Sequence, residues 1–322
     1  MMNRRTLLAG VGTVLLAALA LNPAQAAGGR LNVVATTGMI ADAITQVGGE
    51  RVEVRALMGP GVDPHGYRQT RSDIMAMTSA DAVFWHGLFL EAQLEQFFHE
   101  LGDIKPVVAL AELLPQDSLL GSEEYEGRHD PHVWMDPTLW ADVVEAARDA
   151  LTDLDPEGAE TFAANAETHL QELSELQDYA AGVLATVPPE ARVLVTAHDA
   201  FNYFGRAYDY EVMGIQGIST ESEAGLAQIE SLVRLLVDRR IGGIFVESSV
   251  SDRNVMALIE GARAQGHDLT IGGELFSDAM GSPGSYEGSY IGMIDHNVTT
   301  ITRALGGEAP EKGMKGLLGV AK

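Results

Sequence analysis

The sequence has 322 residues, enough for two ordinary domains, with a formal net charge of −25 and no cysteine. So acidic a chain argues against nucleic acid or an anionic membrane surface as a partner, because both carry charge of the same sign. Without cysteine we expect neither a disulfide nor a lipid-anchored N-terminus.

Residues 1–26 have the pattern of a cleavable export signal. A basic start at Arg4 and Arg5 precedes an apolar run from Thr6 to Leu21, and Ala24-Gln25-Ala26 is a typical cleavage site. The two arginines are compatible with twin-arginine export and equally with the general secretory route. The apolar run is short for a stable membrane span. We therefore expect a soluble protein of the periplasm, and a monomer.

The stretch from 27 to 153 is expected to form a first α/β lobe. Short apolar strands alternate with helical segments such as Met39 to Val47, which is typical of a mostly parallel sheet. The expected strands are Leu31 to Ala35, Val52 to Met58, Ala82 to Trp85 and Pro106 to Leu110. In such sheets ligands bind beyond the carboxyl ends of the strands.

The tripeptide Asp-Pro-His occurs twice in this lobe, at Asp63-Pro64-His65 and at Asp130-Pro131-His132. Each copy lies in an expected loop, and the second precedes an expected helix capped by Asp136. The proline stiffens the backbone, and the aspartate can accept a hydrogen bond from a neighbouring N–H. Because a stiff loop keeps its imidazole in place, we expect His65 and His132 to bind one shared metal ion.

Residues 154–189 are expected to hold a long linking helix from Pro156 to Val187. Asp155 stands at the expected cap position, and prolines at 188 and 189 end the helical pattern. At 1.5 Å per residue such a helix spans about 45 Å, roughly the width of a domain. We interpret it as a rigid strut between two lobes; a long surface helix on a single domain is the alternative.

The stretch from 190 to 322 is expected to form a second α/β lobe, with strands at Arg192 to Thr196, Ile244 to Glu247 and Leu269 to Ile271. His198 follows the first of these strands and Asp278 follows the last. Both are therefore candidate metal ligands, although a capping role is the alternative for each taken alone. Glu247, at a strand end, is a candidate for orienting a ligand imidazole.

Six motifs, in order along the chain, resemble those of a known family: Gly61 to Tyr67, Asp130 to Asp136, Thr196 to Phe201, Gln216 to Thr220, Val246 to Ser249 and Gly273 to Gly281. On these motifs the chain resembles the metal-specific periplasmic binding proteins of ABC transporters, the zinc and manganese class called cluster A-I or cluster 9, especially its TroA-type members. The resemblance implies two α/β lobes with mostly parallel sheets joined by one long rigid helix. It also implies a divalent metal ion that is delivered to the membrane permease of an ABC importer. The family's ligands would fall on the four candidates named above: His65, His132, His198 and Asp278.

The sequence leaves the metal open between zinc and manganese, with iron(II) as a further candidate. Three imidazoles and one carboxylate suit four-coordinate zinc, whereas manganese prefers more oxygen ligands. Manganese-selective relatives often have glutamate where this chain has His198, which favours zinc. Zinc-dedicated relatives often carry a histidine-rich loop before the second ligand, whereas residues 114–127 are acidic and lack histidine, which argues against a zinc-scavenging specialist.

His86 stands where relatives commonly have asparagine, and we expect it to support the site without binding the metal. The remaining histidines are not expected to be ligands: His99, His129, His169, His267 and His296. A zinc hydrolase is an alternative function, but it needs an open coordination position and a general base. The chain has no His-Glu-x-x-His motif and no nucleophile elbow. A metal-binding adhesin is a second alternative, and we expect a binding protein and not an enzyme.

Overall fold

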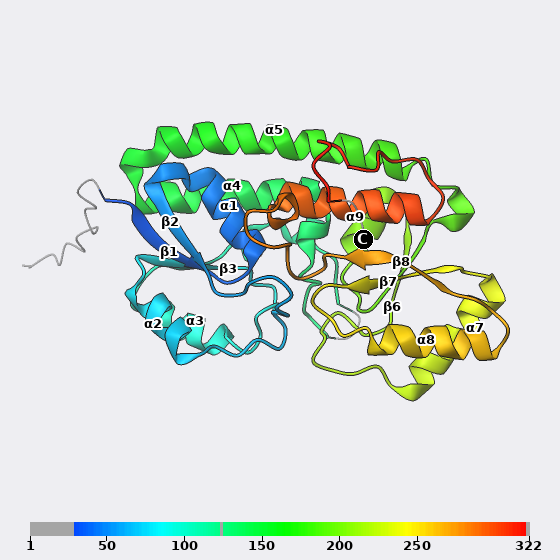
Figure 1. Ribbon diagram of the computed structural model, residues 1–322. Helices are drawn as coiled ribbons and strands as arrows, with labels where there is room; N and C mark the ends of the chain where they lie inside the picture. The colour runs from blue at the N-terminus through cyan, green and yellow to red at the C-terminus, as the bar shows by residue number, and fades with distance from the viewer. Residues whose placement is uncertain (1–28, 123–124, 320–322) are drawn as a thin grey trace, which may run out of the picture.

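The computed structural model describes residues 29–122 and 125–319 (Figure 1). The expected export signal at 1–26 lies outside these described residues. Within the described ranges, no helix is both long and apolar enough to cross a membrane. Two α/β lobes lie side by side, and one long helix, α5 (Ala159–Leu184), runs over both of them (Figure 1).

The first lobe is built on a parallel four-stranded sheet with helices on both faces (Figure 1). Its strand order is β2 (Val52–Ala56), β1 (Leu31–Ala35), β3 (Ala82–Trp85) and β4 (Val107–Ala109). Its helices are α1 (Gly38–Gly48), α2 (Arg71–Ser79), α3 (Glu95–Gly102) and α4 (Pro137–Leu154). All the expected strands are present, with β2 and β4 slightly shorter than expected. Because the strands are parallel, their carboxyl ends share one edge of the sheet.

The second lobe contains two parallel strand pairs, β5 (Val193–Thr196) with β6 (Glu211–Gly214), and β7 (Gly243–Glu247) with β8 (Thr270–Leu275). β5 lies next to β7, so the carboxyl ends of the two pairs are close together. The helices of this lobe are α6 (Asn202–Tyr208), α7 (Leu226–Arg239), α8 (Arg253–Ala264) and α9 (Tyr290–Ala304).

The strands of the second lobe differ from expectation at two places. β6 is not expected from the sequence, and β8 continues to Leu275 instead of ending at Ile271. The sequence Gly272-Gly273 is typical of a loop, but the strand continues through both residues. The register shifts here, between Ile244 and Phe245 of the partner strand, so the strand has a bulge. A side chain at Gly272 would meet the Phe245 ring at 2.7 Å. Glycine therefore allows the close approach that carries the strand towards Asp278.

The two long helices begin in different ways. Asp136 caps α4 as expected, accepting a hydrogen bond from the backbone N–H of Thr138 at 2.9 Å. Asp155, in contrast, does not cap the linking helix: a 3₁₀ turn covers Pro156–Gly158, and α5 begins after it without a side-chain cap. The Asp155 carboxylate instead pairs with Arg51, with Nη2 and Oδ2 2.6 Å apart. A hydrogen bond from a charged guanidinium to a carboxylate is stronger than one from a neutral backbone N–H.

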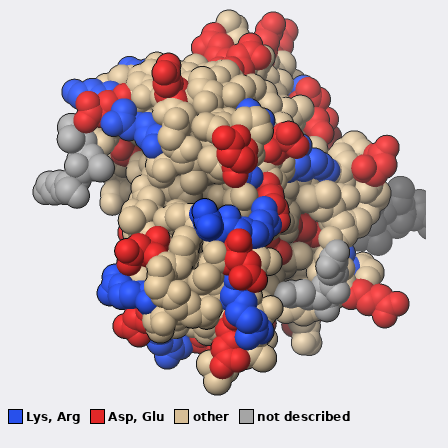
Figure 2. Space-filling model, turned by 90° about the vertical axis from the view of Figure 1, so that its right-hand side faces the viewer, with Lys and Arg blue, Asp and Glu red and all other residues tan. Residues whose placement is uncertain are grey.

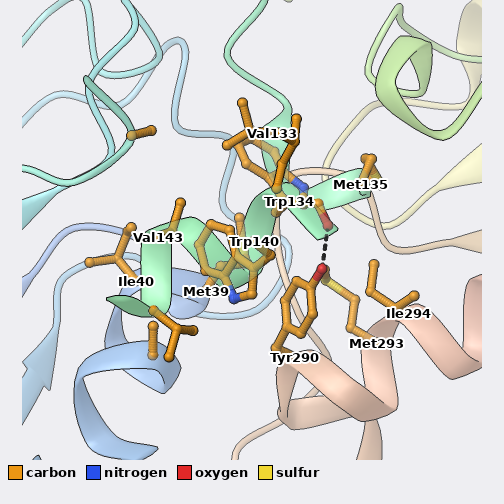
Figure 3. Close-up of a cluster of buried hydrophobic side chains, with 14 of the residues drawn as sticks. Met39, Ile40, Val133, Trp134, Met135, Trp140, Val143, Tyr290, Met293 and Ile294 are labelled. Atoms are coloured by element: carbon orange, nitrogen blue, oxygen red, sulfur yellow. Dashed lines mark hydrogen bonds between the residues drawn. The ribbon is translucent and has the colours of Figure 1, made fainter. Parts of the chain in front are cut away.

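One apolar core runs through both lobes beneath α5 and includes side chains of α1, α4 and α9. Figure 3 shows its centre, where Trp140 of α4 stacks on Tyr290 of α9 with ring centroids 5.1 Å apart. The Tyr290 hydroxyl donates to the carbonyl oxygen of Trp134 at 2.8 Å. The strut interpretation of α5 is confirmed, and packed side chains join the lobes as well, which restricts their separation.

Figure 2 shows the end of the molecule that holds the second lobe. Acidic and basic side chains are interspersed over this face. Ion pairs within the lobe include Arg239 with Glu211 at 2.5 Å and Arg253 with Glu223 at 2.6 Å. The charge on this face is therefore distributed instead of being gathered in one patch.

Candidate metal centre

The four candidate ligands come from both lobes and meet between them. His65 lies in the loop after β2 and His132 in the loop before α4, whereas His198 follows β5 and Asp278 follows β8. One ligand atom from each residue lies within 4.8 Å of the others. All four residues are buried, with exposed fractions of 3% or less. The structure thus brings together every residue that the sequence analysis put forward as a ligand.

The nitrogen and oxygen atoms of these side chains converge on one point. Nε2 of His65 lies 3.3 Å from Nε2 of His132, and Nε2 of His198 lies 3.2 Å from Oδ2 of Asp278. Among the described residues, Nε2 of His198 and both carboxylate oxygens of Asp278 have no hydrogen-bond partner of acceptable geometry. Each unsatisfied buried polar atom costs about 1–3 kcal/mol, and a charged one costs more. A bound cation would satisfy all of them at once.

Carboxylates behind two of the imidazoles hold them in one orientation. Nδ1 of His198 donates to Oε2 of Glu247 at 2.5 Å, and Oε1 of Glu247 accepts the His198 backbone N–H at 2.9 Å. Asp130 accepts from Nδ1 of His132 at 2.7 Å. With the proton on Nδ1, the Nε2 lone pair of each ring faces the shared centre, as is usual for metal-binding histidines. Glu247 therefore contacts a candidate ligand imidazole, as the orienting role expected for it requires.

Burial and neighbouring charges set the protonation of the cluster. Burial lowers the pKa of His65 to about 3, so this imidazole is neutral at neutral pH. Burial acts to raise the pKa of Asp278, but the imidazoles, foremost His198, outweigh it and hold that pKa well below its usual range. Burial acts to lower the pKa of His198, but the Asp278 and Glu247 carboxylates raise it well above its usual value. His198 and Asp278 therefore each stabilise the charged form of the other.

His86 supports the site from behind. Its side chain is fully buried, its Nε2 lies 2.6 Å from the carbonyl oxygen of Pro131, and its ring packs edge-on against Trp134. Because Pro131 directly precedes His132, His86 braces that loop and lies outside the ligand cluster, as expected. The remaining histidines also lie outside the cluster: His99, His129, His169, His267 and His296.

Sequence reasoning misses residues that hold the ligand loops in place. Asn297 of α9 clamps the loop before Asp278, donating to the carbonyl oxygen of Phe276 at 2.7 Å and accepting its N–H at 2.9 Å. Asp130 is expected to accept a backbone N–H, but it binds the His132 ring as well. The Asp-Pro-His spacing is a usable signal for Asp130. Nothing in the sequence, in contrast, links Asn297 to the segment between β8 and Asp278.

Comparison with known proteins places these features in a family. Residues 33–304 match the family model described as ZnuA, zinc-uptake complex component A, periplasmic. The chain is 44% identical over 276 residues to the manganese-binding lipoprotein MntA of Bacillus subtilis, covering 86% of this chain and 90% of that protein. It is 44% identical over 280 residues to the zinc-binding protein TroA of Treponema pallidum, covering 87% of this chain and 90% of that protein.

Solved structures share the fold. The periplasmic zinc-binding protein TroA from Treponema pallidum matches with a TM-score of 0.84 at 44% identity, covering 86% of this chain and 99% of that one. Fe(III)-bound YtgA from Chlamydia trachomatis matches with a TM-score of 0.78 at 29% identity, covering 86% and 99%. The expected two-lobed α/β architecture is confirmed, and nothing in these matches supports a hydrolase or an adhesin. The chain belongs to the ZnuA family of periplasmic zinc-uptake components.

Proposed function

We propose that this protein captures one divalent transition metal ion in the periplasm and delivers it to the membrane permease of an ABC importer. His65, His132, His198 and Asp278 are the proposed ligands. The observation that carries the proposal is the convergence of their buried ligand atoms, several of them unpartnered, on one point between the lobes. The names of MntA as manganese-binding and TroA as zinc-binding support a transition metal as the cargo.

The donor set favours zinc or manganese, with iron as a third candidate. Three nitrogen donors and one carboxylate suit tetrahedral zinc, with Zn–N distances near 2.0–2.1 Å expected in the loaded site. A carboxylate that binds through both oxygens supplies a fifth donor atom, which suits manganese better. The general affinity order favours zinc over manganese, so metal availability decides which ion is carried. The Fe(III)-bound state of YtgA supports keeping iron in the comparison.

Binding and release, without catalysis, is the activity that this site supports best. A catalytic zinc site keeps one coordination position open and places a general base beside it. Here four protein side chains surround the point of convergence, and the nearby Glu247 carboxylate is committed to the ring and backbone of His198. The proposed site is complete within one chain, which supports action as a monomer.

For the rest of the chain we propose the following division, from the N-terminus onwards. Residues 1–26 form a cleavable export signal, and 27–153 form the N-terminal lobe. Residues 154–189 hold the linking helix, and 190–322 form the C-terminal lobe. Export to the periplasm, by the twin-arginine or the general secretory route, is supported by Arg4, Arg5 and the apolar run after them.

Calorimetric titration of chelator-stripped protein with Zn²⁺ and Mn²⁺ tests the proposal. We expect one tight site per chain. Replacing any of the four ligands by alanine is expected to lower zinc affinity by more than about 100-fold, since removing a ligand costs more than removing its supporting group. His99→Ala, in exposed surface on α3, is the matched control and should bind as the wild type does. Absence of a tight site, more than one, or equal losses in His65→Ala and His99→Ala would each reject the assignment.

A further inference from the structure

Each aspartate of the two Asp-Pro-His loops makes a hydrogen bond within its own loop and another to a side chain of the second lobe. One oxygen of each aspartate accepts the backbone N–H of the histidine two residues on, at 2.8 Å for Asp63 and 3.0 Å for Asp130. The other oxygen accepts a donor from the second lobe. For Asp63 this donor is the hydroxyl of Thr220, and for Asp130 it is the side-chain amide of Asn202, at 3.1 Å. Each aspartate therefore bridges a ligand loop of one lobe to a side chain of the other.

These cross-lobe bonds are of a strong type. An ionised carboxylate accepting from a neutral donor makes a charge-assisted hydrogen bond, roughly twice as strong as a neutral one. Asp130 is 1% exposed, so loss of its amide partner would leave a buried oxygen unsatisfied. Tyr203, next to Asn202, donates to the carbonyl oxygen of Asp130 at 2.8 Å and fixes the same loop. Contacts with the second lobe therefore add to the bonds that hold the loops carrying His65 and His132.

Another cross-lobe hydrogen bond has no such connection. Gln93 donates to Glu221 at 2.7 Å, on the exposed surface and one residue beyond Thr220. Neither Gln93 nor Glu221 bonds to a loop that carries a candidate ligand. This contact joins the lobes without shaping the site, so it is a matched internal control.

We propose that Thr220 and Asn202 are positioning residues that couple contact between the lobes to the geometry of two ligands. The proposal rests on the proposed function, since it assumes that His65 and His132 bind the ion. When the lobes separate, both bonds break, the two Asp-Pro-His turns lose one partner each, and the imidazoles leave their binding geometry. Separation of the lobes thereby promotes release of the ion. We call the Thr220–Asp63 and Asn202–Asp130 hydrogen bonds the latches. The Gln216 to Thr220 motif, which supplies no ligand, contributes Thr220 to one of them.

The test is the rate at which Zn²⁺-loaded protein loses its ion to an excess of a fluorescent chelator in a stopped-flow instrument. Thr220→Val and Asn202→Leu are each expected to speed release about tenfold, because one charge-assisted hydrogen bond is lost. Thr220→Ser keeps the hydroxyl and should release at nearly the wild-type rate. Gln93→Leu should leave the rate unchanged. In an Asp63→Ala background, Thr220→Val should have no further effect, because its partner is already gone.

Wild-type release rates in both Thr220→Val and Asn202→Leu would overturn the proposal. So would equal acceleration by Gln93→Leu, or an undiminished effect of Thr220→Val in the Asp63→Ala background. If one variant fails to fold, the other latch carries the same test independently. If the wild-type protein takes up no Zn²⁺, the proposed function itself fails, and that result is recognised before any variant is compared.

Discussion

The two Asp-Pro-His loops have the same three residues and the same bond from the aspartate to the histidine backbone, yet they hold their imidazoles differently. Asp130 binds both the backbone N–H and the ring Nδ1 of His132. Asp63 binds the backbone N–H of His65 but not its ring, and its other oxygen accepts from Thr220. The motif therefore determines the turn of the backbone, while the direction of the imidazole depends on its surroundings.

The electrostatics of the two aspartates differ accordingly. Burial raises the pKa of Asp63, and the nearby Asp278 carboxylate raises it further. Burial also acts to raise the pKa of Asp130, but the charge and hydrogen bonds of His132 outweigh it and lower that pKa. Asp130 thus supports its imidazole electrically as well as sterically, whereas Asp63 shapes only the backbone. The Asp130 carboxylate therefore fixes the imidazole of its loop directly, and the Asp63 carboxylate does not.

Among these comparisons, the largest change in zinc affinity is expected from removing the charge that Asp130 places beside the His132 ring. Asp130→Asn should lower zinc affinity by about 10- to 100-fold, the range known for residues that orient metal-binding histidines. Asp63→Asn keeps an acceptor for the His65 backbone and should cost only about two- to threefold. Calorimetric titration with Zn²⁺ measures both. Equal losses in the two variants would show that the ring contact of Asp130 is unimportant.

The next prediction concerns His198, the imidazole that the second lobe contributes to the candidate site. Replacing this neutral nitrogen donor by a glutamate gives an anionic oxygen donor, which suits manganese more than zinc. We expect His198→Glu to narrow the zinc-to-manganese preference about tenfold, and His198→Ala to weaken binding of both ions.

Competitive titration of the two metals measures this ratio. Because Glu247 lies 2.5 Å from Nδ1 of His198, a new carboxylate there faces an existing one. The variant is therefore paired with Glu247→Gln, which removes the repulsion. An unchanged ratio in both backgrounds would mean that His198 does not bind the metal.

Zinc affinity is also expected to depend on pH. His198 must be a neutral imidazole to bind metal. Against the effect of burial, the Asp278 and Glu247 carboxylates raise its pKa, so protons compete with the metal for this residue. Zinc affinity should rise with pH until it passes the raised pKa, and fall by about tenfold per pH unit below it for one displaced proton. His65, with a pKa of about 3, contributes nothing in this range. Titration in buffers of different ionisation heat counts the released proton, and a flat affinity from pH 7.5 to 5 would contradict the assignment.

The smallest effect is expected in overall shape. α5 and the stacked pair of Trp140 and Tyr290 join the lobes, so the latches can open with only a modest separation. Scattering profiles of metal-free and metal-loaded protein should nearly coincide. A clear drop in radius of gyration on loading would show that the packed interface opens much further than this.

Local patterns in the sequence were enough to predict the α/β class, most strands, the capped start of α4 and the four candidate ligands. Each of these depends on residues close together in the chain. Hydrophobic alternation predicts a strand, and a ligand such as His198 follows directly from its position after one. Where the local pattern misleads, a distant partner is the reason: Asp155 pairs with Arg51, 104 residues away, instead of capping α5.

Only the tertiary structure decided which supporting residue contacts which candidate ligand. Glu247 reaches His198 across 49 residues, and Thr220 reaches Asp63 across 157. Which of the two identical tripeptides binds its own imidazole through the aspartate is likewise not determined by the tripeptide itself. Hydrogen bonds act over about 3 Å, and only folding brings groups so far apart in the chain to that distance.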